Sequence, residues 1–126
     1  MARRTARRIV GDWCLPLSAD DVELAVSELV GNAVHHAARN APRGRVTVVF
    51  RAWSRWLLVE VADESPVPPA FPVGSALSPQ PPGLAEGGRG LYLVGCLADG
   101  VWWSARESGG KSVFCRFRFR PFEEAP

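Results

Sequence analysis

The feature that most constrains the fold is an apolar repeat with helical spacing in the first third of the chain. Between residues 19 and 39, small and branched apolar residues recur every three or four positions, at Val22, Ala25, Val26, Leu29, Val30, Ala33 and Ala37. This period predicts one long amphipathic helix. Ser18 is placed to cap its start, and Asp20 and Asp21 lie in the first turn, where the helix dipole favours acidic groups.

Two predicted hairpins supply a second layer to cover that helix. Residues 46–52 and 56–62 form the first hairpin, and residues 101–105 and 112–120 form the second. The last strand alternates apolar residues with Arg116, Arg118 and Arg120, so one face of the sheet is expected to be solvated. We therefore expect an α+β fold, a two-layer α/β sandwich whose mixed or antiparallel sheet carries helices on one face.

Three further segments complete the expected organisation. Residues 2–14 predict a short helix with Ile9, Val10 and Trp13 directed inward, and residues 91–98 predict another helix. Residues 64–88 hold seven of the eleven prolines and no periodicity. A loop of that length in a compact domain is usually functional or disordered.

Composition excludes several classes of protein. The 126 residues, 47% of them hydrophobic, suit one domain over residues 1–126. A net charge of +2 does not demand a nucleic-acid partner, and we expect no direct nucleic-acid binding. Three widely spaced cysteines show no metal or disulfide pattern, and no apolar run is long enough to span a membrane. Without a secretion signal, a cytoplasmic location is expected.

Glu28 and Asn32 are the first candidates for chemistry. They lie four residues apart on the long helix, so their side chains are neighbours on adjacent turns. Mg²⁺ prefers oxygen ligands and keeps several waters, which suits the Asn32 carbonyl, and a nearby Glu28 carboxylate could accept a proton. An ordinary surface Glu and a helical Asn are the alternative interpretation of the pair.

His36 and Asp63 are the next candidates. His36 lies one turn beyond Asn32 and could line the same site, although a packing histidine fits the sequence as well. Asp63 ends a predicted strand, where its carboxylate could accept a hydrogen bond from an exocyclic amine such as that of adenine. A turn-forming Asp is the alternative.

A glycine run at residues 87–90 opens the later helix. Free amides at a helix start attract phosphate, glycine permits close approach, and Arg89 could add a charged donor. Plain turn glycines and a solvated arginine are the alternative. The later run Gly109-Gly110-Lys111-Ser112 lacks phosphate-loop spacing and predicts a hairpin turn, with Ser112 entering the strand beside the end that holds Asp63.

Taken in order, these motifs resemble the GHKL ATPase superfamily, in particular the anti-sigma-factor serine kinases of the actinomycete type. The segment from Glu28 to Ala37 resembles the N box, and Val61 to Pro66 resembles the adenine-binding box. Gly88 to Val94 resembles the second glycine box, and Gly109 to Val113 the closing strand. The resemblance covers about residues 6–119 and implies a Bergerat-type ATP-binding fold.

The resemblance also implies a role for each matching residue. Asn32 would hold Mg²⁺ and Glu28 would be the catalytic base. Asp63 would bind the adenine amine with help from Ser112, residues 64–88 would form the ATP lid, and the remaining nucleotide contacts would come from His36, Gly88, Arg89, Gly90 and Leu91.

The implied function is an ATP-binding anti-sigma regulator. Such a protein phosphorylates a serine on a STAS-type anti-anti-sigma partner, sequesters a sigma factor, or does both, and the resemblance suggests a homodimer. Superfamily kinases commonly carry glycines after the adenine-box Asp, whereas this chain has Glu64-Ser65-Pro66, which predicts a stiffer lid hinge. The alternative is a non-catalytic protein-binding module with a degenerate nucleotide site.

Overall fold

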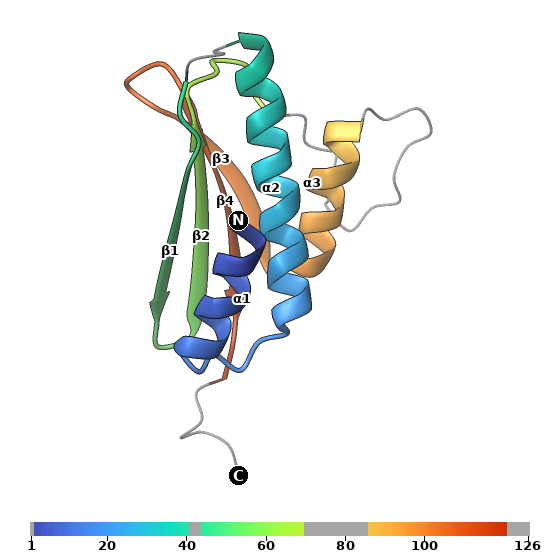
Figure 1. Ribbon diagram of the computed structural model, residues 1–126, viewed down its shortest axis with the longest axis vertical. Coiled ribbons are helices and arrows are strands. Elements are labelled where there is room, and N and C mark those ends of the chain that lie inside the picture. The colour runs from blue at the N-terminus through green and yellow to red at the C-terminus, as the bar shows by residue number, and fades with distance from the viewer. Residues whose placement is uncertain (1, 41–43, 70–85, 121–126) are drawn as a thin grey trace.

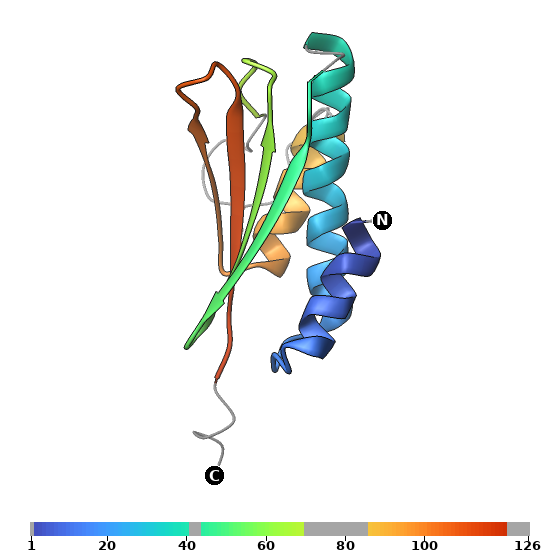
Figure 2. The same cartoon turned by 60° about the vertical axis from the view of Figure 1, so that its left-hand side comes forward.

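The protein is a two-layer sandwich of helices on a sheet. The computed structural model describes residues 2–40, 44–69 and 86–120, and Figures 1 and 2 show its helices on one face of its sheet. This arrangement confirms the expected α+β class. The elements in chain order are α1 (Ala2–Asp12), α2 (Ala19–Asn40), β1 (Thr47–Trp53), β2 (Trp56–Asp63), α3 (Glu86–Leu97), β3 (Gly100–Ala105) and β4 (Lys111–Arg118).

The sheet joins the two predicted hairpins through their second strands. Its strand order is β1-β2-β4-β3, and every pairing among the described residues is antiparallel. The central pairing sets Val61 opposite Val113 and Asp63 opposite Lys111. Because side chains alternate between faces along a strand, Asp63 and Lys111 share the helix-covered face with the core residues of β2 and β4.

The core lies between the helices and that face of the sheet. Leu57, Val59 and Val61 of β2 are each no more than 1% exposed. They pack in one cluster with apolar side chains of α2, α3 and β4: Val22, Ala25, Val26, Leu29, Ala33, Leu91, Val94, Val113, Cys115 and Phe117. The apolar period of residues 22–37 therefore has the role predicted for it.

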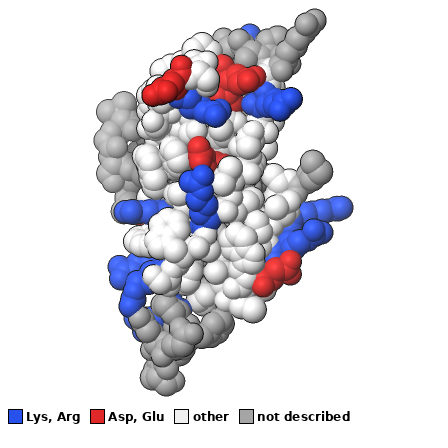
Figure 3. Space-filling view, turned by 90° about the vertical axis from the view of Figure 1, so that its left-hand side faces the viewer, with Lys and Arg blue, Asp and Glu red and all other residues white. Residues whose placement is uncertain are grey.

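The opposite face of the sheet is solvated, as the alternation in the last strand predicted. Trp102 stacks on Phe114 with ring centroids 5.3 Å apart. The Arg116 guanidinium lies 4.5 Å from the centroid of the Trp56 ring, so arginines shield part of the aromatic surface. Figure 3 shows the side of the molecule where the sheet lies, with basic side chains spread around a largely uncharged surface.

The end of α1 differs from the expectation. The helix stops at Asp12, and Cys14 has a left-handed backbone with φ of 53°. The Leu15 amide donates to the Val10 carbonyl at 3.0 Å, which is the bonding pattern of a left-handed helix cap. Trp13 lies beyond the last turn and is 45% exposed, so the expected inward orientation was wrong.

Ion pairs connect α1 to α2. Arg3 lies 3.0 Å and Arg7 2.7 Å from the Glu23 carboxylate, and Arg7 also contacts Asp20. The hydrogen bond from Arg7 lowers the pKa of Glu23. Ser18 caps α2 as predicted, accepting a hydrogen bond from the Asp21 amide at 3.2 Å.

Helix α3 begins earlier than the sequence predicted. It starts at Glu86 rather than near Leu91, so the glycines at positions 87, 88 and 90 lie within its first turns. Glycine disfavours a helix by about 1 kcal/mol relative to alanine, so local propensity favours a later start. Packing of α3 against α2 outweighs that preference.

No helix among the described residues is long and apolar enough to cross a membrane.

Candidate functional site

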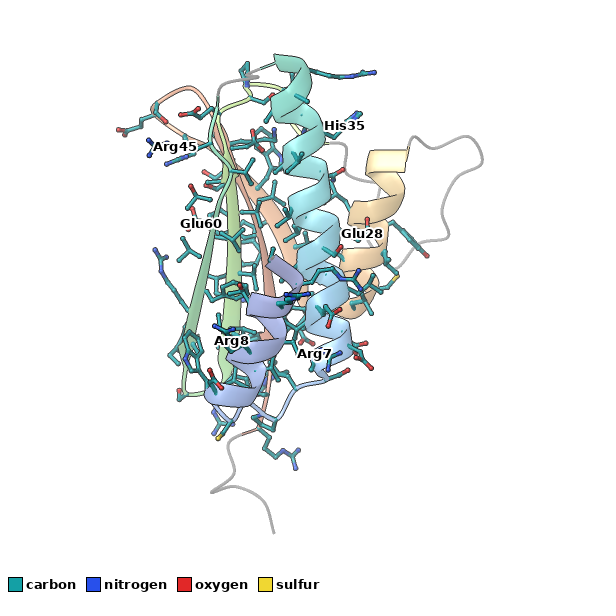
Figure 4. The ribbon with its side chains drawn as sticks, in the orientation of Figure 1. Arg7, Arg8, Glu28, His35, Arg45 and Glu60 are labelled. Atoms are coloured by element: carbon teal, nitrogen blue, oxygen red, sulfur yellow. The ribbon has the colours of Figure 1, made fainter. Side chains whose placement is uncertain are left out.

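One end of the candidate site lies between α2 and α3. Glu28 and Asn32 are both half-buried on α2, one turn apart. Figure 4 shows Glu28 between the two helices. The structure therefore places Glu28 at a helix–helix boundary, with Asn32 one turn further along α2, and α3 follows directly from the predicted lid segment.

Gly90 of α3 is packed against the Glu28 carboxylate. Gly90 is buried, and a Cβ atom at this position would stand only 2.7 Å from Glu28 Oε2. Real Cβ atoms do not approach an oxygen so closely, so any side chain at position 90 would displace the Glu28 carboxylate from its observed position. The glycine run thus has a second use besides the helix start that the sequence suggested.

The other end of the site is built around Asp63. This residue ends β2 and is fully buried. Its Oδ1 accepts hydrogen bonds from the Ser65 amide at 2.8 Å and from Lys111 Nζ at 3.0 Å. Its Oδ2 is also buried and has no hydrogen-bond partner among the described residues. A buried acceptor without a partner is costly, and it marks a place where a donor from a ligand would be stabilised.

His36 links the two ends along α2. Burial lowers the pKa of His36, the Lys111 ammonium lowers it further, and the Asp63 carboxylate opposes both effects. His36 therefore lies in the electrostatic field of the Asp63–Lys111 pair. Glu28, Asn32 and His36 follow at intervals of four residues, so they form a row about 12 Å long on α2. An elongated ligand fits a row of this shape.

Ser112 does not join these residues. It pairs with Ala62 in the sheet, and its hydroxyl donates to Glu60 at 2.8 Å on the solvated face. Asp63 is one residue further along β2 and therefore points to the opposite face. The adenine contact expected of Ser112 has no support in this geometry.

The remaining predicted residues lie in α3. Gly88 and Arg89 are in the first turn, where backbone amides lack partners within a helix. Leu91 is 1% exposed and belongs to the hydrophobic core. Its side chain therefore packs inside the fold, although the resemblance groups it with the nucleotide contacts.

Sequence reasoning missed two residues of this site, Lys111 and Gly110. Lysine is rarely buried, and the sequence pattern places Lys111 in a turn, yet it is only 2% exposed. A Cβ on Gly110 would overlap the Asp63 carbonyl oxygen, so the turn packs directly on the backbone that carries Asp63. The usable signal was the two-residue alternation of β4, which puts Lys111 on the core face with Val113.

The described residues also form a hollow away from this candidate site. A hollow of about 590 Å³ is lined by Arg55, Asp99, Arg118, Phe119 and Arg120. It lies at the other end of β2 and β4 and contains none of the predicted residues. No group of three or more His, Cys, Asp or Glu side chains that could hold a metal occurs in the described part of the chain.

The sequence profile of the histidine kinase-like ATPase domain matches residues 2–117. The chain belongs to the histidine kinase-like ATPase family. The match includes both ends of the site described above, so Asp63, Lys111, Glu28 and Gly90 all lie inside the family domain.

Curated relatives are bacterial serine kinases. The chain is 38% identical over 87 residues to the serine-protein kinase RsbW of Bacillus subtilis, covering 65% of this chain and 54% of that protein. It is 30% identical over 89 residues to the RsbW of Oceanobacillus iheyensis, covering 67% and 56%. The chain thus spans about half the length of the curated relatives it matches.

Solved structures with the same fold are histidine kinase domains. The catalytic domain of histidine kinase ThkA superposes with a TM-score of 0.60 at 17% identity, covering 83% of this chain and 70% of that one. A mycobacterial sensor histidine kinase, MprB, gives 0.57 at 19% identity, covering 83% and 74%. At these identities the likeness supports the fold alone.

Proposed function

We propose that this chain is an ATP-dependent serine kinase that regulates a sigma factor. The observation that carries the proposal is the buried Asp63 Oδ2, an acceptor without a partner among the described residues. It lies at one end of a row that leads along α2 to Glu28. A carboxylate oxygen in that state fits the exocyclic amine of adenine, which is a donor.

The residues at the other end fit the triphosphate and its Mg²⁺. Asn32 would hold Mg²⁺, which supplies neutralisation of the phosphate charge when it is bound. The backbone amides in the first turn of α3, at Gly88 and Arg89, would hold the terminal phosphates. Glu28 would accept the proton from the serine hydroxyl of the partner protein. Residues 64–88 would be the lid, of which residues 70–85 lie outside the described residues.

The turn after Asp63 supports a working site despite its missing glycines. Ser65 donates its amide to Asp63 Oδ1, and its hydroxyl oxygen accepts from the Val67 amide at 3.2 Å. Among the described residues, positive φ angles occur only at Cys14 and Gly109, so this turn needs no glycine. Glu64-Ser65-Pro66 therefore builds its own support for the Asp63 carboxylate.

The relatives carry the name serine-protein kinase, which supports a serine of another protein as the phosphate acceptor. We propose that the phosphorylated protein is a STAS-type anti-anti-sigma factor in the cytosol. We also propose that the second partner, which this chain binds and releases, is a sigma factor. The alternative is a module that binds its partner without phosphate transfer. The two differ in one measurable step, the transfer of the γ-phosphate.

Calorimetry with Mg-ATP followed by a phosphate-transfer assay tests the proposal. The wild-type protein should bind Mg-ATP and phosphorylate a STAS protein encoded in the same genome. Asn32→Ala should abolish transfer. Glu28→Gln should slow transfer by about 100- to 10,000-fold while ATP affinity is retained, because it removes only the proton acceptor. Binding without any transfer would favour the non-catalytic module, and a silent titration would refute both the nucleotide site and the kinase.

A further inference from the structure

The lysine of the site is an unusual residue for its position. Lys111 is the one lysine in the sequence, and it is 2% exposed at the start of β4. Burying an ammonium group costs several kcal/mol unless a charged partner offsets the cost. Two apolar side chains of similar size would often fill such a position with equal or better stability. The pair formed by Lys111 and Asp63 therefore points to a role beyond holding the sheet together.

The two carboxylate oxygens of Asp63 differ in the hydrogen bonds that they accept. Oδ1 takes both donors, the Ser65 amide and the Lys111 ammonium, whereas Oδ2 takes none from the described residues. Gly110 lies against the Asp63 carbonyl and the Glu64 backbone, so the main chain beside the carboxylate is also held in place. The carboxylate is thus held at Oδ1, while the buried Oδ2 has no partner among the described residues.

We propose that Lys111 is a positioning residue for base selection, an inference that rests on the nucleotide site proposed above. Its ammonium pairs with the ionised Asp63 carboxylate and anchors Oδ1, so that Oδ2 is presented as a pure acceptor. An ionised carboxylate accepts hydrogen bonds only, whereas a protonated one can donate. The site then selects a purine with an exocyclic amine, as in adenine, and rejects one with a carbonyl oxygen there, as in hypoxanthine.

Comparison of three triphosphates tests this role. ATP carries the amine, inosine triphosphate carries a carbonyl oxygen in its place, and purine riboside triphosphate carries neither. The wild-type protein should bind ATP tightest by calorimetry. Lys111→Met should weaken ATP by about 10- to 100-fold, the value of one hydrogen bond to a charged group, and leave purine riboside triphosphate nearly unchanged. An equal loss for all three would mean that Lys111 only supports the structure, and would overturn the proposal.

The Asp63→Asn variant is the reference in which the effect of Lys111→Met is measured without the carboxylate. In Asp63→Asn the carboxylate is gone, so adding Lys111→Met should cause no further change in the ratio of ATP to purine riboside triphosphate affinity. This double variant buries no unpaired charge and remains a usable test if Lys111→Met alone does not fold. A further loss of selection in the double variant would contradict the proposal. Wild-type protein that fails to bind ATP would refute the nucleotide site itself, whereas wild-type binding with unchanged selection in Lys111→Met would refute only the role of Lys111.

Discussion

At the scale of single residues, the contact between Gly90 and Glu28 is a sensitive point of the proposed phosphate-binding end of the site. The Glu28 carboxylate occupies the space that a side chain at position 90 would need. Because the obstructing group is the end of a flexible side chain, a substitution would move the carboxylate and leave the backbone in place. Function and stability therefore separate at this position.

We expect Gly90→Ala to fold normally and to transfer phosphate about 100-fold more slowly, the loss typical of a displaced catalytic group. Gly31→Ala is the matched control, since Gly31 is an exposed glycine of α2 and a Cβ added there would meet no other atom within 4 Å. That control should gain about 0.5–1 kcal/mol in unfolding free energy and keep its transfer rate. Thermal unfolding and a transfer assay measure both, and full activity in Gly90→Ala would contradict the assigned role of Glu28.

Sequence reasoning proposed part of the candidate site at this scale. Helical spacing and a strand end place Glu28, Asn32, His36 and Asp63 without tertiary information. Lys111 was not among the predicted residues, because its role depends on contact with Asp63, which lies 48 residues away in the sequence. Ser112 was placed with Asp63, although a one-residue offset in a strand reverses the face.

At the scale of elements, the turn between β3 and β4 supports Asp63, at the proposed base-binding end of the site. Gly109 has φ of 103°, a conformation that side chains rarely adopt, and nothing lies within 4 Å of its missing Cβ. Gly110 has the opposite constraint, since a Cβ there would overlap the Asp63 carbonyl oxygen. One glycine shapes the turn, and the other lets the turn approach Asp63.

Substitution of the two glycines should separate these effects. Both Gly109→Ala and Gly110→Ala should destabilise the fold by about 1–3 kcal/mol, through backbone strain and overpacking respectively. Only Gly110→Ala should also weaken ATP binding, because it displaces the backbone of Asp63. Urea unfolding and calorimetry on both variants measure the difference. Equal ATP affinity in the two would show that the position of the turn does not matter to the site.

The elements themselves were largely predictable. Helix α2 and both hairpins follow from strong periodic patterns that local chemistry and tertiary packing both favour. The start of α3 and the end of α1 were not, because glycine propensity at residues 87–90 and a left-handed Cys14 oppose the simplest interpretation. Packing of α3 against α2 decides the first boundary, and a local left-handed cap at Cys14 decides the second.

At the scale of the whole molecule, the three cysteines report on the integrity of the core. Cys14 and Cys96 are exposed, whereas Cys115 is buried between the sheet and the helices. Burial raises the pKa of Cys115 to about 12. A thiol with that pKa has almost no reactive thiolate at pH 8, so its modification requires the core to open.

A thiol reagent at pH 8 should therefore modify two cysteines rapidly and the third slowly. Saturating Mg-ATP at about 100 times its dissociation constant should slow the third reaction by about 100-fold, since ligand binding stabilises the closed molecule by mass action. Mass spectrometry of timed samples identifies each site. Rapid modification of all three would contradict the buried position of Cys115, and Cys115→Ser would confirm which thiol is slow.

The pairing of β2 with β4 has a consequence for protein synthesis. Lys111 and Asp63 come from different hairpins, and they meet only when the second hairpin has joined the first. A growing polypeptide that has released its first 100 residues from the ribosome already carries Glu28, Asn32 and Asp63, yet it lacks the strand that anchors the carboxylate. At the proposed nucleotide site, the Asp63 carboxylate is therefore anchored by Lys111 only after β4 has emerged and paired with β2.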